Sequence, residues 1–103
     1  MNSLLFILVL IFSLKCNHIQ SITWQSGGWA YACDFAIGVN DLTNSLTTAS
    51  QCGPKCLATS SCTHFTWTNY KGGTCYMKFG KVSQSDAHST TDNTMVCGIL
   101  KCN

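Results

Sequence analysis

The chain has 103 residues, enough for one domain, and its formal net charge at pH 7 is +2. Its six basic residues are all lysine, and it contains eight cysteines but neither arginine nor glutamate. Such a chain lacks the clustered cations that recognition of nucleic acid, phosphate or heparin requires, so these functions are disfavoured.

Residues 1–21 are expected to be a signal peptide. Leu4 to Leu14 are apolar except for Ser13, and these 11 residues are too few for a membrane-spanning helix of ~20 residues. We expect cleavage after Ser21, with cleavage after Cys16 and an uncleaved anchor as alternatives. The domain is then 22–103, secreted to the extracellular space without a membrane span, and an oxidising compartment favours disulfides.

The first predicted strand begins at Trp29, where large side chains alternate with small ones. This period of two is typical of a strand that buries its large residues, and it favours a core over an aromatic ligand platform. The large residues are Trp29, Tyr31, Cys33, Phe35 and Ile37. Gly38 to Asn44 is expected to be a loop.

A short helix is predicted from about residue 49 to 59. Thr48 and Gln51 have the spacing of a capping box, with Thr48 as the N-cap. Pro54 lies inside this helix and is expected to kink or restart it.

A hairpin follows the helix. After Cys62, polar and aromatic residues alternate up to Thr68, as in a half-buried strand. Residues 69–73 are glycine-rich and predict the loop, and residues 75–80 predict the returning strand. Residues 83–94 are polar and predict a surface loop, and residues 95–99 predict the last strand.

The cysteine spacing resembles that of the PAN/apple domain family over residues 24–99. The resemblance rests on a helix with Cys-x-x-x-Cys, a strand with Cys-x-x-Phe-x-Trp, and the segment Gly-Thr-Cys-Tyr-Met-Lys at residues 73–78. It implies an α+β, disulfide-rich fold in which one short helix packs across a twisted antiparallel sheet. It also implies a non-catalytic module that binds extracellular proteins or glycans, with the disulfides Cys33–Cys97, Cys52–Cys75 and Cys56–Cys62.

Cys102 is an addition to this pattern and makes seven cysteines in residues 22–103. We expect it to be exposed and to form a disulfide-linked dimer or a mixed disulfide. If the leader were cleaved before Cys16, that residue is an alternative partner. A structural or effector role through such assembly is therefore the alternative to a recognition module.

Two catalytic or metal hypotheses are weaker. A zinc site could be drawn from Cys52, Cys56, Cys62 and His64, but secreted thiols oxidise to disulfides. A hydrolase could be proposed from Asp86, His88 and the neighbouring serines, but the segment is typical of a solvated loop. No enzyme activity, cofactor or metal is expected.

Strand parity predicts the candidate binding surface. One face of the hairpin should meet the helix with Phe65, Trp67, Cys75, Met77 and Phe79. The opposite face should then expose an aromatic ring beside hydroxyls and a cation, which suits a sugar or a polar protein surface, although a solvated sheet face is the simpler interpretation. These candidate residues are His64, Thr66, Thr68, Tyr76 and Lys78.

Overall fold

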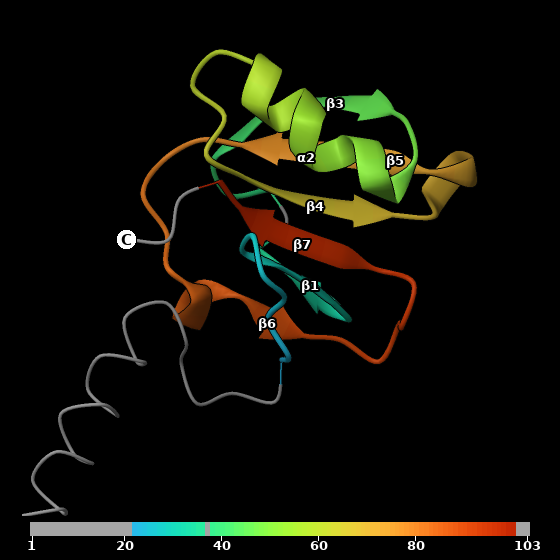
Figure 1. Cartoon of the computed structure of the whole chain (residues 1–103). Helices are drawn as coiled ribbons and strands as arrows, with labels where there is room; N and C mark the ends of the chain where they lie inside the picture. The colour runs from blue at the N-terminus through green and yellow to red at the C-terminus, as the bar shows by residue number, and fades with distance from the viewer. Residues whose placement is uncertain (1–21, 37, 101–103) are drawn as a thin grey trace, which may run out of the picture.

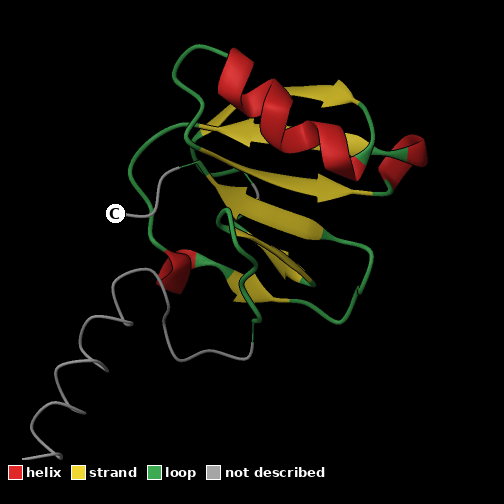
Figure 2. Cartoon of the chain, viewed as in Figure 1, coloured by secondary structure: helices red, strands yellow, loops and turns green. Residues whose placement is uncertain are grey.

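The computed structural model describes residues 22–36 and 38–100. Its elements in chain order are β1 (Trp29–Tyr31), β2 (Cys33–Asp34), β3 (Asp41–Leu46), α2 (Ala49–Ala58), β4 (His64–Thr68), η1 (Tyr70–Gly72), β5 (Thr74–Lys78), η2 (Gln84–Asp86), β6 (His88–Ser89) and β7 (Val96–Ile99). Five strands form an antiparallel sheet in the order β1-β7-β4-β5-β3, and β2 pairs with β6 in a second sheet (Figure 1). Helix α2 lies across β4 and β5 (Figure 2). The predicted α+β class, with one helix on an antiparallel sheet, is confirmed.

Helix α2 agrees with the sequence in its position and in Thr48 as its N-cap residue, but not in the predicted capping bonds. It is one helix with Pro54 inside it, so the predicted restart is wrong. Thr48 precedes the helix with an extended backbone, but its side chain makes no capping bond and instead lies 3.3 Å from the Ser50 hydroxyl. The predicted capping box is therefore absent from this helix.

The first predicted strand is broken into two. Ala32 has a φ of 56°, which an extended strand cannot accommodate, so β1 ends before it and β2 begins after it. Its N–H donates to Met95 O, and its carbonyl accepts from Thr90 N–H, which holds the break in place. Tyr31 is 56% exposed, so the prediction that it is buried is wrong, whereas Phe35 is buried. Ile37 lies outside the described residues.

Residues 41–44 of strand β3 were predicted as part of a loop. The sequence of β3, Asp-Leu-Thr-Asn-Ser-Leu, is polar because this edge strand is exposed along most of its length. Pairing with β5 orders it, with a register shift between Asp41 and Thr43. Backbone hydrogen bonding to a neighbouring strand thus decides a structure that side-chain periodicity does not indicate.

The sheet has a hydrophobic core on each face. On the helix side, four disulfide-bonded cysteines are buried together with Phe65, Met77 and Val96. On the opposite side, the core contains Phe35 and Ala87 with Ile22, Ala30 and Ile99. Residues 83–94, predicted as a surface loop, therefore include two buried residues, Gln84 and Ala87, and the strand β6. The second layer is formed by β2, β6 and the turns around them.

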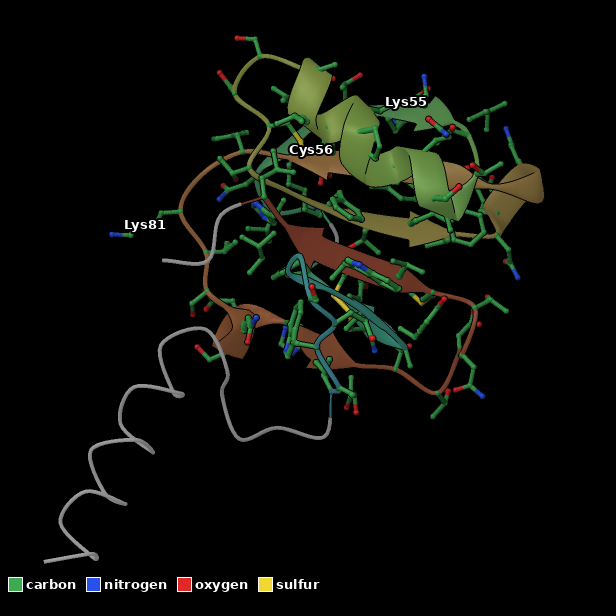
Figure 3. All side chains as sticks on the ribbon, viewed as in Figure 1. Lys55, Cys56 and Lys81 are labelled. Carbon is green, nitrogen blue, oxygen red and sulfur yellow. A yellow bond between two sulfur atoms is a disulfide. The ribbon has the colours of Figure 1, made fainter. Side chains whose placement is uncertain are left out.

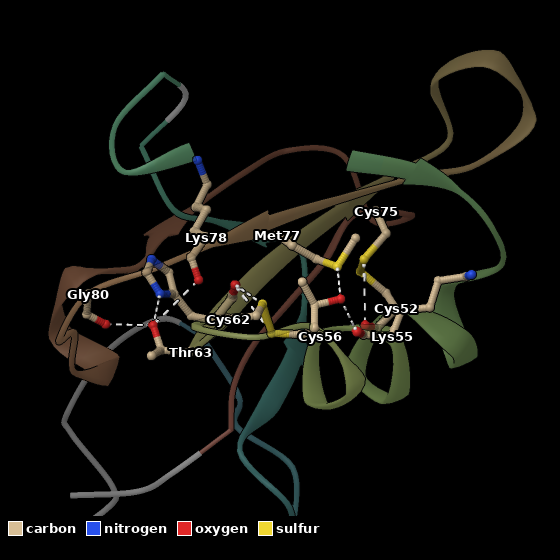
Figure 4. The surroundings of a disulfide bond; sticks show 11 residues. Cys52, Lys55, Cys56, Cys62, Thr63, Cys75, Met77, Lys78 and Gly80 are labelled. Atoms are coloured by element: carbon tan, nitrogen blue, oxygen red, sulfur yellow. Dashed lines mark hydrogen bonds between the residues drawn. A yellow bond between two sulfur atoms is a disulfide. The ribbon is translucent and has the colours of Figure 1, made fainter. Parts of the chain in front are cut away.

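Three disulfides cross-link these layers. Cys52–Cys75 joins α2 to β5, Cys56–Cys62 joins α2 to the segment before β4, and Cys33–Cys97 joins β2 to β7. They are the three pairs that the family resemblance implies. Figure 4 shows the first two close together beside Met77, and Figure 3 shows Cys56 at the helix while Lys55 and Lys81 project from the surface.

The expectations for residues 1–21 and for Cys102 lie outside the described residues. Within the described ranges, no helix is long and apolar enough to cross a membrane.

Candidate functional site

The five candidate binding residues share the sheet face opposite α2, but three of them are buried. His64, Thr66 and Lys78 are each 2% exposed, whereas Thr68 and Tyr76 are half-buried. The prediction that all five face solvent is therefore wrong. The cause is the chain from β2 to the start of β3, which folds over this face and was predicted to be part strand and part loop.

His64 is a core residue beneath this cover. The Phe35 ring meets it edge-on, with 4.8 Å between ring centroids, and Nδ1 lies 2.8 Å from the Thr63 hydroxyl. Burial, aided by the positive charge of Lys78, lowers the pKa of His64 from 6.5 to about 4, although Asp86 acts in the opposite direction. The ring is therefore neutral at pH 7, and its role is structural.

Lys78 fastens the covering segment to the sheet. Its Nζ donates to the carbonyl oxygens of Ala36 at 3.0 Å and Val39 at 3.3 Å, and it pairs with the Asp41 carboxylate. Thr66 helps from the neighbouring strand, because its hydroxyl oxygen accepts the Phe35 N–H at 3.1 Å. Both residues thus position the segment that shapes the site.

A polar pocket of about 320 Å³ remains where this cover ends. Four of the five candidates line it, and His64 does not. Lys78 and Thr66 lie beside the covering segment, and Thr68 and Tyr76 continue the sheet surface. The sequence thus predicted most of the pocket residues that the sheet contributes. It did not predict that the covering segment would enclose the pocket.

Asp34 and Asn44 are the pocket residues that sequence reasoning missed. Asp34 lies on β2, and Asn44 faces Tyr76 across the β3–β5 ladder. Asn44 was assigned to a loop. Only the alternation that places Leu42, Asn44 and Leu46 on one face of a strand could have indicated where the Asn44 side chain points.

Several polar groups in this pocket have no partner in the described part of the chain. One carboxylate oxygen of Asp34 is buried without a hydrogen bond there. The side chains of Asn44 and Tyr76 likewise make no hydrogen bond with any described residue. Buried polar groups are normally paired, so the unpaired Asp34 oxygen is typical of a site that a ligand or water completes. The exposed Asn44 and half-buried Tyr76 side chains lie in the same pocket and are open to solvent.

Comparison with known families gives one match. Residues 37–85 match the family model of the PAN-like domain. The chain is therefore similar to PAN-like domains over these residues. The resemblance to the PAN/apple family is confirmed by this match. No curated protein and no solved structure matched the chain.

The PAN-like segment contains β3, α2, β4 and β5, and with them two of the three disulfides. It therefore contains the sheet side of the polar pocket. Asp34 comes from outside the matched segment, as do both residues of Cys33–Cys97.

The residues of the zinc and hydrolase hypotheses have other roles or environments in the structure. Cys52, Cys56 and Cys62 form disulfides, so their sulfur atoms are not thiolates that could hold zinc. The Asp86 carboxylate accepts the N–H of Ser83 at 2.8 Å and so caps η2. His88 is exposed on β6.

Proposed function

We propose that this protein is a secreted, non-catalytic recognition module and that its polar pocket binds a carbohydrate. The observation that carries the proposal is one concave site in which the buried, unpaired Asp34 carboxylate oxygen lies with the solvent-accessible Asn44 amide and Tyr76 phenol. The PAN-like match supports the broader class, a module that binds proteins or carbohydrates.

The chemistry of these groups suits neighbouring sugar hydroxyls. A carboxylate accepts hydrogen bonds from hydroxyls, an amide both donates and accepts, and a tyrosine ring offers an apolar face with a polar tip. The volume of about 320 Å³ lies at the lower end of the range for ligand pockets, so we expect one or two sugar rings to be held.

Charge favours a neutral sugar. The only cation that lines the pocket in the described structure, Lys78, is already paired with Asp41, and the chain contains no arginine. A sulfated or phosphorylated glycan would need further cations, whereas the two carboxylates in this pocket would repel it.

A glycan array with the secreted protein tests the proposal. For any glycan bound, we expect Tyr76→Ala and Asp34→Asn to weaken binding by about tenfold or more, because each removes a group that should contact the sugar. Tyr70→Ala is the matched control, since Tyr70 is an exposed tyrosine outside the pocket. Binding of no glycan, or equal binding by all three variants, would refute the proposal.

Assembly through Cys102 is the second candidate, favoured by the odd number of cysteines in residues 22–103. A structural or effector protein of this kind should run as a dimer on a non-reducing gel, and Cys102→Ser should abolish the dimer. A secreted monomer would exclude the disulfide-linked dimer.

A further inference from the structure

A second, larger pocket of about 680 Å³ lies on the helix side of the sheet. It occupies the angle between the first half of α2 and the strands β1 and β7, which the helix does not cover. The carbohydrate proposal concerns the opposite face and does not use this pocket. We propose that it binds a neutral, largely apolar small molecule that contains a flat ring system.

The floor of this pocket is closed and apolar. Phe65 pairs with Gly98 across the β4–β7 ladder, and both Phe65 and Val96 are 5% exposed. A Cβ at Gly98 would lie 2.5 Å from the Phe65 ring and 3.1 Å from Trp29 Cβ, so only glycine lets the ring lie over β7. The flat aromatic floor therefore depends on a bare backbone position in the next strand.

The walls favour an aromatic or other planar ligand. Trp29 and Tyr31 stand edge-to-face with 5.1 Å between ring centroids, and both line the pocket. Opposite them, α2 contributes Ala49, Gly53 and Pro54, which are small or rigid. Aromatic edges and faces make favourable contacts with rings in such an arrangement.

The charge of the lining sets the charge of the ligand. None of the residues that line this pocket is charged, and the hydroxyls are those of Tyr31, Thr48 and Ser50. These three residues are exposed and so stand at the mouth. An ionised ligand would lose hydration without gaining an ion pair, whereas a neutral ligand with one hydroxyl or carbonyl would not.

The surroundings favour a small molecule over a protein partner. A stable protein interface covers about 800 Å² on each partner and extends over a continuous surface. Of the large hydrophobic residues that are highly exposed in the described chain, Tyr31 alone lines this pocket. The others, Val39, Leu42, Leu46, Leu57, Tyr70 and Phe79, do not, so no broad apolar rim surrounds the cavity. Its volume lies within the range of small-molecule sites.

Two fluorescent probes with the same ring skeleton but different charge test whether the pocket prefers a neutral ligand. N-phenyl-1-naphthylamine is neutral, and 1-anilinonaphthalene-8-sulfonate is its anionic counterpart. Titrated into the secreted protein, the neutral probe should bind saturably at one site, and the anionic probe should bind at least about tenfold more weakly. Equal binding of both, or no saturable binding of the neutral probe, would overturn the proposal.

Two variants locate the site. Tyr31→Ala removes one wall of the pocket and should weaken binding of the neutral probe by about tenfold. Tyr70→Ala should not change this binding, although Tyr70 (58% exposed) is as accessible as Tyr31 (56% exposed). Gly53→Leu should block the cavity, because a Cβ there would lie 3.5 Å from the Phe65 ring without a clash. Thermal unfolding checks that both variants remain folded.

Probe binding by the variants and the oligomeric state of the protein decide between the possible occupants of the pocket. Loss of probe with Tyr31→Ala but not with Tyr70→Ala supports the site, and unchanged binding by Tyr31→Ala and Gly53→Leu refutes it. If sedimentation shows that the protein dimerises and that Tyr31→Ala breaks the dimer, the occupant is a second copy and the small-molecule proposal is wrong.

Discussion

Replacing Lys78 by Met should destabilise the domain, although a lysine on an antiparallel sheet face would ordinarily be replaceable. The Lys78 side chain is 3% exposed, and methionine has a similar length but no donor. The change removes the hydrogen bonds to the carbonyls of Ala36 and Val39 and the ion pair with Asp41. The segment that covers the sheet would lose its main polar anchor.

The magnitude follows from these contacts. A hydrogen bond from a charged donor contributes about 1.5–3 kcal/mol, but the freed carbonyls lie on exposed residues and can bind water. Methionine also avoids the cost of burying an ammonium group. We therefore expect a net loss of about 2–3 kcal/mol in the free energy of unfolding, equivalent to a fall in Tm of roughly 10–20 °C for a domain of this size.

Urea unfolding followed by tryptophan fluorescence measures this loss. Lys55→Met, on the exposed side of α2, is the control and should change stability by less than about 0.5 kcal/mol. Asp41→Asn should cost less than about 1 kcal/mol, because that carboxylate is 54% exposed. If Lys78→Met were as mild as Lys55→Met, or Asp41→Asn as severe as Lys78→Met, the assignment of the anchor to the two carbonyls would be wrong.

Three further predictions concern stability. The unfolded chain binds more protons than the folded one between the ordinary His64 pKa of 6.5 and its folded value of about 4, so the free energy of unfolding should fall by about 3 kcal/mol as the pH is lowered across this range. His64→Gln should flatten that dependence in urea titrations at pH 7 and pH 4, and an unchanged slope would contradict it. Trp67→Ala should lower the free energy of unfolding by about 3 kcal/mol and Tyr76→Ala by about 1 kcal/mol. The reason is that only the Trp67 indole packs against the helix-side core, and it also donates a hydrogen bond to Thr47 O. The reverse order would mean that the two sheet faces are misassigned. Cys33–Cys97 should contribute about 4 kcal/mol and Cys56–Cys62 about 2 kcal/mol, since their sequence separations are 64 and 6, and serine variants analysed with peptide mapping would check both the values and the pairs.

The sequence predicted the parts of the fold that local patterns encode. The helix was expected from about 49 to 59 and spans Ala49–Ala58, because two cysteines four residues apart mark its buried face. The hairpin of β4 and β5 also follows from alternation and a glycine-rich loop. Strand β3 could not be predicted in this way, because its polar side chains carry no pattern of burial.

The difference between local sequence patterns and long-range packing also explains how well the candidate site was predicted. Parity correctly placed Thr66, Tyr76 and Lys78 on one sheet face. It could not show that Phe35 would pack over that face, because the strand carrying Phe35 was expected to continue through Ala32. The positive φ of Ala32 ends β1 and turns the chain, and the segment that follows covers Lys78 and one side of the polar pocket.

The two pockets meet at consecutive residues of β4. Phe65 forms the floor of the apolar pocket, and Thr66, which points to the other face, lines the polar one. Strand β4 is hydrogen-bonded on both sides, to β5 and to β7, so it cannot shift toward one ligand without breaking a ladder. A disulfide-linked layer also covers each face of the sheet, through Cys52–Cys75 on one side and Cys33–Cys97 on the other. Because a ligand alters a second site only through an element with two arrangements, and this strand is held in one, the two pockets should bind their ligands independently.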